Sequence, residues 1–95
     1  MKIEFDGAKN NWNIRERGIS FAIVEQFDFY TAIRVEDERK NYGETRIIAY
    51  GFVGKRLHVL CYKPITDSSI RVISFRKANK REEKFYEKSI AALNK

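Results

Sequence analysis

The sequence has few of the side chains on which metal and cofactor chemistry depends, since its 95 residues include one cysteine and one histidine. One residue of each type cannot build a zinc site, and a single cysteine cannot close an internal disulfide. The sequence also lacks a glycine-rich phosphate loop, and its acidic residues do not have the spacing of a two-metal nuclease site. We therefore expect no metal ion and no cofactor.

The isolated reactive side chains are predicted to be structural. Cys61 lies in the apolar run 57–62, so it is expected to be a buried thiol. His58 has no carboxylate near it in the sequence and is predicted to be a surface or half-buried imidazole. The acidic run 36–38 is predicted to lie in a solvated loop, with binding of a basic partner segment as the alternative.

Long apolar runs are missing as well. No stretch approaches the roughly 20 consecutive apolar residues that cross a membrane, and residues 1–6 lack the apolar core of a signal peptide. Hydrophobic residues make up 43% of the chain and aromatic residues 14%, which is typical of a folded globule. We expect one domain spanning residues 1–95, located in the cytoplasm and without a membrane partner.

Positive charge is concentrated at the end of the chain. From Arg71 onward there are eight Lys or Arg and three Asp or Glu, which gives +5 of the total net charge of +6. Residues three or four apart share a face of a helix, so the basic residues here form one stripe. Such a stripe most often binds a phosphate backbone. The residues of this stripe assigned to RNA binding are Lys77, Lys80, Arg81 and Lys84. Arg17, from the first predicted helix, is assigned to RNA binding as well.

Periodicity and capping residues predict an α+β fold with a mainly antiparallel sheet, two N-terminal helices and a C-terminal helix packed on the sheet. Asp6 and Ser20 are expected to cap the two N-terminal helices, and Gly18 is expected to end the first one. Strands are predicted over 2–5, 45–53, 56–62 and 70–75, and the alternating pattern of a strand also begins at Ala32, Ile33 and Val35. Helices are predicted over 8–17 and 78–93, with a short one after Ser20 that places Ile23 and Phe27 on its apolar face.

The pair Gly54-Lys55 is typical of a two-residue hairpin turn, which sets the register of the strands on either side. This register places the apolar residues 48, 50, 52, 57, 59 and 61 on one face of the sheet. The other face is predicted to be the wetter one. There Gly51 lies opposite His58 and would leave room for a ligand to approach.

The remaining inventory of Arg, Lys, Tyr and Glu is sufficient for cleaving RNA. The 2′-hydroxyl of RNA is its own nucleophile, so the protein supplies only a base, an acid and cations that stabilise the phosphorane. Arg71 and Arg76 would clamp the phosphate, with Tyr86 as a stacking group or an acid. Because these arginines are five residues apart, they face the same way only if a bulge intervenes or the strand ends first. The alternative is that Arg71 lies at the sheet edge and contacts the partner.

Two other functions fit the same residues. One is a module that binds RNA or DNA without cleaving it. The other is an interaction protein whose basic surface is covered by an acidic partner segment.

Several short motifs, in this order along the chain, resemble the BrnT toxins of bacterial type II toxin–antitoxin pairs. They are Phe5-Asp6-Gly7-Ala8-Lys9-Asn10 with Asn13, Gly18-Ile19-Ser20-Phe21 with Phe27, Asp37 with Gly43-Glu44-Thr45-Arg46, and residues 70–78 with Glu82, Glu83 and Tyr86. The resemblance implies a compact RelE-like domain that cleaves RNA and halts translation. It also implies neutralisation by a BrnA-like antitoxin with a ribbon-helix-helix part, and contact with DNA only through that antitoxin.

Carried onto this chain, the resemblance points to a catalytic set made of Lys9, Glu44, Arg46, Arg71, Arg76 and Tyr86. One departure concerns the residues before Gly18. Such toxins usually carry Lys-His there, whereas this chain has Glu16-Arg17. Arginine keeps a positive charge but cannot exchange a proton near neutral pH. Either this position only binds phosphate, or the toxin is weak or inactive.

Overall fold

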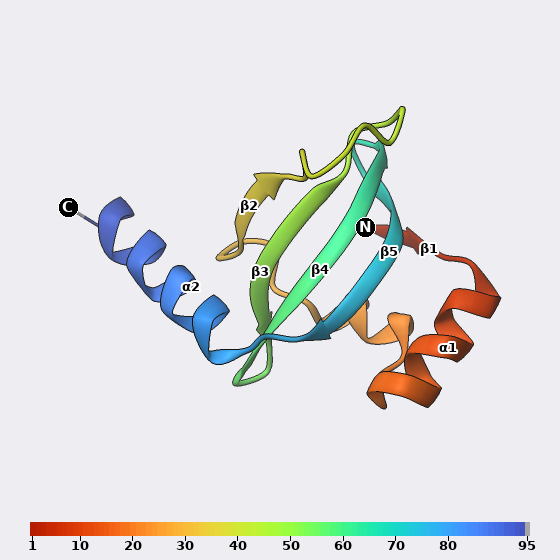
Figure 1. Ribbon diagram of the computed structural model, residues 1–95, viewed down its shortest axis with the longest axis horizontal. Helices are drawn as coiled ribbons and strands as arrows, with labels where there is room; N and C mark the ends of the chain where they lie inside the picture. Colours follow the sequence, from red (N-terminus) through yellow and green to blue (C-terminus); the bar gives the residue numbers. More distant parts are fainter. Residues whose placement is uncertain (95) are drawn as a thin grey trace.

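The computed structural model describes residues 1–94, which form a five-stranded sheet in the order β1-β5-β4-β3-β2 (Figure 1). Strand β1 pairs with β5 in parallel, and the other neighbouring strands are antiparallel. The prediction of an α+β fold is confirmed. The elements are β1 (Lys2–Glu4), α1 (Gly7–Arg17), the 3-10 helix η1 (Phe21–Gln26), β2 (Ile33–Glu36), β3 (Ile47–Val53), β4 (Arg56–Thr66), β5 (Ser69–Lys77) and α2 (Lys80–Leu93).

The N-terminal elements begin and end largely where their capping residues predict. The Asp6 side chain accepts a hydrogen bond from the backbone N–H of Lys9, and Gly18 ends α1 with a φ of 71°. The Ser20 side chain caps the next element in the same way. That element is a 3-10 helix of six residues rather than an α-helix. Short connectors often take this tighter form.

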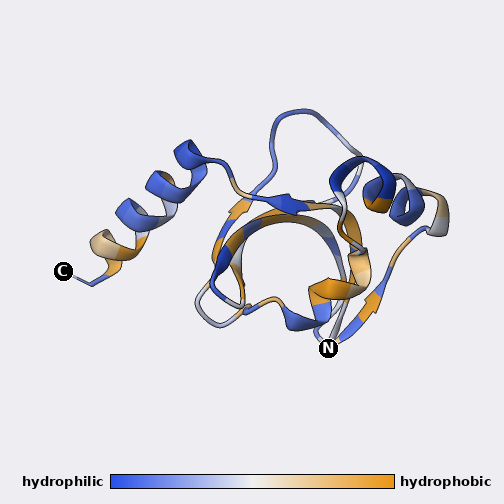
Figure 2. Ribbon diagram, turned by 90° about the horizontal axis from the view of Figure 1, so that it is seen from below, coloured by the Kyte–Doolittle hydropathy of each residue, from blue (hydrophilic) through white to orange (hydrophobic). Residues whose placement is uncertain are grey.

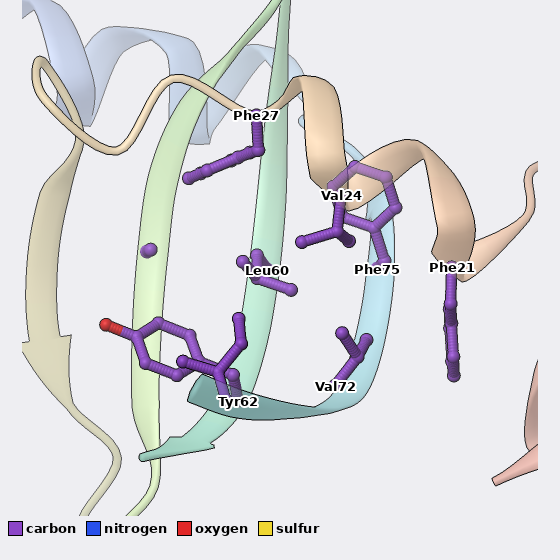
Figure 3. Packing of buried hydrophobic residues seen from close by; sticks show 9 residues of the cluster. Phe21, Val24, Phe27, Leu60, Tyr62, Val72 and Phe75 are labelled. Carbon is purple, nitrogen blue, oxygen red and sulfur yellow. The ribbon is translucent and has the colours of Figure 1, made fainter. Parts of the chain in front are cut away.

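The main core lies on the face of the sheet that was predicted to be the wetter one. The hairpin register itself is confirmed, with Val53 opposite Arg56 and Gly51 opposite His58. However, η1 packs onto this face. Figure 2 shows that the sheet curves and partly encloses it. Figure 3 shows the resulting cluster, which includes Phe21, Val24, Phe27, Leu60, Tyr62, Val72 and Phe75.

The space above Gly51 is taken by the protein itself. A Cβ atom at this position would lie 2.5 Å from Cζ of Phe27, so the glycine allows that ring to approach the sheet. His58 is 4% exposed and its ring stacks on Phe75, so the prediction of a surface or half-buried imidazole is wrong. The expected opening for a ligand is therefore filled by core side chains.

Helix α2 covers only part of the opposite face. Tyr86 packs its ring edge-on against Phe52, and Phe85 lies beside Tyr50. Tyr86 is the one buried residue of α2, and the helix projects beyond the sheet in Figure 1. The apolar contacts of α2 extend along one side of the helix as far as Ile90, so the prediction of a packed C-terminal helix is correct for that side. No helix within residues 1–94 is long and apolar enough to span a membrane.

A β-bulge in β5 changes which side chains share a face. Cys61 of β4 pairs with Ser74, whereas the next residue, Tyr62, pairs with Val72, which leaves Ile73 as an extra residue. A bulge of this kind shifts the alternation of the strand by one. As a result, Arg71 and Arg76 project from the same face of the sheet although five positions separate them.

Candidate active site

A polar pocket of about 400 Å³ lies where α1, the edge of the sheet and the loop before β3 meet. Four of the predicted catalytic residues line it, namely Lys9, Glu44, Arg46 and Arg71. They come from segments that are far apart in the sequence. The rest of the lining is Glu4, Lys63, Ile65 and Ile73.

Lys9 reaches this pocket because α1 is tied to β5 by a buried asparagine. Asn13 is 1% exposed, and its Nδ2 donates hydrogen bonds of 2.9 Å to the carbonyl oxygens of Ile19 and Phe75. A buried amide of this kind is costly unless its hydrogen bonds are satisfied, so these contacts set the position of the helix. Lys9 makes none of the ion pairs found among residues 1–94.

Arg71 lies on the exposed side of β5, at the same level as Glu4 of β1. Its guanidinium donates to Glu4 Oε1 over 3.2 Å, and both side chains are about half exposed. Exposed ion pairs of this kind contribute at most about 1 kcal/mol. An anionic ligand in the pocket would therefore compete readily with Glu4 for Arg71.

Glu44 lies between two cations. Arg46 Nε donates to Glu44 Oε2 over 3.0 Å, and Lys63 Nζ lies 3.3 Å from Glu44 Oε1. The hydrogen bond from Arg46 is the largest cause that lowers the pKa of Glu44, followed by that from Lys63. The carboxylate is therefore ionised at neutral pH.

Arg46 is in turn supported by the loop between β2 and β3. Its guanidinium lies 4.0 Å from the centre of the Tyr42 ring, and the Tyr42 hydroxyl donates to Asp37 Oδ2 over 3.1 Å. Asp37 is buried and also receives two hydrogen bonds of 2.8 Å from the Arg39 guanidinium. These bonds, that of the Arg39 side chain above all, hold the pKa of Asp37 well below its usual range. The prediction that this acidic run is simply solvated is therefore wrong for Asp37.

Sequence reasoning did not identify Lys63 or Tyr42. Lys63 lies directly opposite Arg71 across the β4–β5 pair. Extending the hairpin register along β4 would have placed Lys63 on the face of Val59 and Cys61. For Tyr42 the loop sequence gives no comparable signal, because its contacts depend on how the loop folds.

Arg76 lies away from this pocket. Its guanidinium makes two hydrogen bonds of 2.8 Å to the carboxylate of Glu82, at the start of α2. Glu82 also accepts the backbone N–H of Asn79 in a capping box. Arg76 pairs with Val59 of β4, whereas Arg71 pairs with Lys63, four residues further along that strand. At about 3.3 Å per residue, the two arginines are therefore roughly 13 Å apart along the sheet. The bulge required for an arginine clamp is present, but the two arginines pair with different glutamates.

Tyr86 is also outside the pocket. It is 8% exposed, and its hydroxyl donates to the backbone carbonyl of Thr31 over 2.9 Å. This contact links α2 to the segment before β2, so the hydroxyl already has a structural partner.

The predicted RNA-binding residues divide between two places. Lys80, Arg81 and Lys84 line a shallow hollow on α2, and Lys77 is exposed at the end of β5. Figure 1 shows α2 and α1 on opposite sides of the sheet, so this stripe is separate from the polar pocket. Arg17 instead lines a hollow that adjoins the polar pocket, where it lies over Trp12.

The lone thiol and imidazole lie in the interior. Cys61 is buried, as predicted, and burial raises its pKa. Burial also lowers the pKa of His58, whose Nδ1 contacts the carbonyl of Arg56. Within residues 1–94, no three His, Cys, Asp or Glu side chains gather where they would hold a metal ion.

Comparison with known proteins identifies the family. Residues 5–82 match the family described as the ribonuclease toxin BrnT of type II toxin–antitoxin systems. The structure is similar to the 1.1 Å crystal structure of the Brucella abortus ribonuclease toxin BrnT, with a TM-score of 0.66 and 30% sequence identity. That likeness covers 84% of this chain and 99% of the Brucella chain. No protein of curated function matches the sequence.

The family match ends within the first turn of α2, so Lys84 and Tyr86 lie beyond it. It includes all four predicted catalytic residues that line the polar pocket. Membership implies an RNA substrate and an antitoxin partner. The chain belongs to the BrnT family of ribonuclease toxins of type II toxin–antitoxin systems.

Proposed function

We propose that the chain is a metal-independent endoribonuclease that uses the 2′-hydroxyl of its substrate as the nucleophile and thereby inhibits translation in the cytoplasm. The observation that carries this proposal is the convergence of Lys9, Arg46 and Arg71 around the ionised Glu44. With Lys63 added, four cations face two carboxylates, Glu4 and Glu44, so the pocket carries a charge of +2. A cationic pocket suits a phosphodiester whose charge increases in the transition state.

Glu44 is the proposed general base, since it is a carboxylate of the pocket that Arg46 and Lys63 hold in its ionised form. A glutamate whose pKa is lowered holds no proton to give at neutral pH, so it can only accept one. In the proposed step, Glu44 takes the proton of the 2′-hydroxyl while that oxygen attacks phosphorus. The bond from phosphorus to the 5′-oxygen breaks, which leaves a 2′,3′-cyclic phosphate and a 5′-hydroxyl.

The cations divide the remaining work. Arg71 and Arg46 bind the non-bridging oxygens of the phosphate, where preorganised guanidinium groups stabilise the developing charge. Lys9, which is outside the ion pairs described above, delivers a proton to the leaving 5′-oxygen. No proton passes through Arg17, so the usual histidine of the family is not needed in this scheme.

The antitoxin is proposed to be a BrnA-like protein with a ribbon-helix-helix part. Its acidic segments would cover basic surface of the toxin, and DNA would be contacted only through it. The stripe of Lys80, Arg81 and Lys84 on the projecting α2 offers such a surface away from the polar pocket.

The direct test measures RNA cleavage by the purified protein in EDTA, with analysis of the new RNA ends. Arg71→Ala should reduce the rate about 100-fold or more, since it removes a preorganised transition-state donor. Arg15→Ala is the matched control, because Arg15 is an exposed arginine of α1 paired only with Glu16. Cleavage that stops in EDTA would contradict metal independence, and equal activity of the two variants would remove Arg71 from the mechanism.

The separation of the α2 stripe from the pocket supports a second candidate, a module that binds nucleic acid without cleaving it. Such a module would show a steep fall of RNA affinity with salt and intact RNA even at high protein concentration. Arg71→Ala would then leave binding to the α2 stripe nearly unchanged.

A further inference from the structure

Beside the polar pocket lies a second hollow of about 290 Å³, between α1 and β5. Lys9 and Ile73 line both, so the two are continuous. The second hollow is bordered by Trp12 and Arg17 of α1 and by Ser74 of β5. Among its described lining residues there are two cations, Lys9 and Arg17, and no carboxylate. Its charge therefore favours a ligand that carries a negative group.

Trp12 is presented to this hollow by the geometry of the helix. It is three residues after Lys9, so both side chains lie on one face of α1. Trp12 is 46% exposed, although the main core is rich in aromatic rings. The guanidinium of Arg17 lies 5.1 Å from the centre of the Trp12 ring, so an aromatic group and a planar cation are held together.

The pair is held in place by Asn13. Arg17 donates to Asn13 Oδ1 over 3.3 Å, while Nδ2 of Asn13 is bonded to the carbonyls of Ile19 and Phe75. Both the Nδ2 group and the Oδ1 atom of Asn13 therefore already have hydrogen-bond partners within the protein. What the hollow offers a ligand is mainly flat apolar and guanidinium surface rather than free amide groups.

We propose that this hollow is a nucleobase subsite, in which the base next to the scissile phosphate stacks on the Trp12–Arg17 pair. Aromatic rings and guanidinium planes are the surfaces on which unpaired bases stack. Lys9 lies between the two hollows, so a phosphate at Lys9 would join the base to the linkage in the polar pocket. The subsite rests on the proposed cleavage of RNA, and it gives Arg17 a role that needs no proton exchange.

Trp12 is the only tryptophan of the chain, so its fluorescence reports directly on this subsite. The full protein is titrated with a short single-stranded oligonucleotide that has the bases of RNA but hydrogen in place of every 2′-hydroxyl. This oligonucleotide lacks the nucleophile, so it can bind but cannot be cleaved. We expect quenching by this oligonucleotide and little quenching by the same backbone without bases. Fluorescence that does not respond to either oligonucleotide would overturn the proposal.

Variants provide the second measurement. Trp12→Ala should weaken binding of the uncleavable oligonucleotide roughly 5- to 100-fold and raise KM for RNA more than it lowers kcat. Trp12→Phe should recover most of the affinity, because it keeps a ring. Ile14→Ala is the matched control, since Ile14 is an exposed apolar residue of α1 that does not line the hollow.

The outcomes separate this proposal from the proposed catalysis. Quenching by bases in a protein that cleaves no RNA would keep the subsite and reject the nuclease. Cleavage that Trp12→Ala leaves unchanged in KM would keep the nuclease and reject the subsite. Quenching by the antitoxin but by no oligonucleotide would show a protein-docking surface and overturn the proposal.

Discussion

Lys63 and Arg71 lie directly opposite each other across the β4–β5 pair, and each reaches a different carboxylate of the same pocket. Lys63 contacts Glu44 from the loop before β3, whereas Arg71 contacts Glu4 from β1. Cations on directly paired residues of neighbouring strands repel each other unless negative charge lies between or beside them. The two glutamates thus offset this repulsion, and a bound phosphate would take over the same role.

Glu44→Gln should slow RNA cleavage strongly without weakening RNA binding. The change removes the proposed base and raises the charge of the pocket, so affinity for RNA should stay equal or increase while the rate falls about 100-fold or more. Cleavage and binding of uncleavable RNA are measured on the same preparation. Since the pKa of Glu44 is lowered from 4.5, the wild-type protein should keep most of its rate between pH 7 and pH 5 as far as protonation of Glu44 is concerned. A rate that falls because a group with a pKa near 6 gains a proton would assign the base to another residue.

Tyr42 is predicted to position Arg46. Tyr42→Ala removes the ring beneath the guanidinium and should reduce cleavage roughly 2- to 30-fold, which corresponds to a cation–π contact of about 0.5–2 kcal/mol. Tyr42→Phe keeps the ring and loses only the hydrogen bond to Asp37, so it should restore most of the activity. Equal losses in the two variants, or a loss explained entirely by a lower melting temperature, would contradict the positioning role.

Arg76 is predicted to stabilise the start of α2 rather than to bind the scissile phosphate. Arg76→Ala leaves Glu82 without its guanidinium partner and should lower the free energy of unfolding by about 1 kcal/mol, a modest value because Arg76 is partly exposed. Denaturant unfolding measures this change. The folded variant should still cleave RNA, and a 100-fold loss of activity at unchanged stability would return Arg76 to the catalytic set.

The Tyr86 hydroxyl is predicted to act only in folding. Tyr86→Phe removes its hydrogen bond to the carbonyl of Thr31 and should cost about 1 kcal/mol of stability, because that carbonyl loses its partner. Tyr30→Phe is the control, since Tyr30 is 96% exposed. RNA cleavage should be unchanged in both variants. Loss of cleavage in Tyr86→Phe alone would support the role as an acid.

The local elements of this protein are determined by its sequence. The caps at Asp6 and Ser20, the helix end at Gly18 and the turn at Gly54-Lys55 all form as predicted, because each depends on a few neighbouring residues. The motifs that identify the family are equally readable without coordinates, and they include Lys9, Glu44, Arg46 and Arg71.

The tertiary structure decided which face of the sheet is the core and which predicted residues meet. Both faces of the hairpin carry apolar groups, so the choice depended on where η1 packs and on Phe27 filling the space above Gly51. The bulge at Ile73 then placed Arg71 and Arg76 on the same face of the sheet, and Arg76 forms its ion pair with Glu82 rather than facing the pocket. Periodicity describes neighbours along the chain, whereas a pocket is made by residues that are distant in it, and their meeting depends on the packing of the whole molecule.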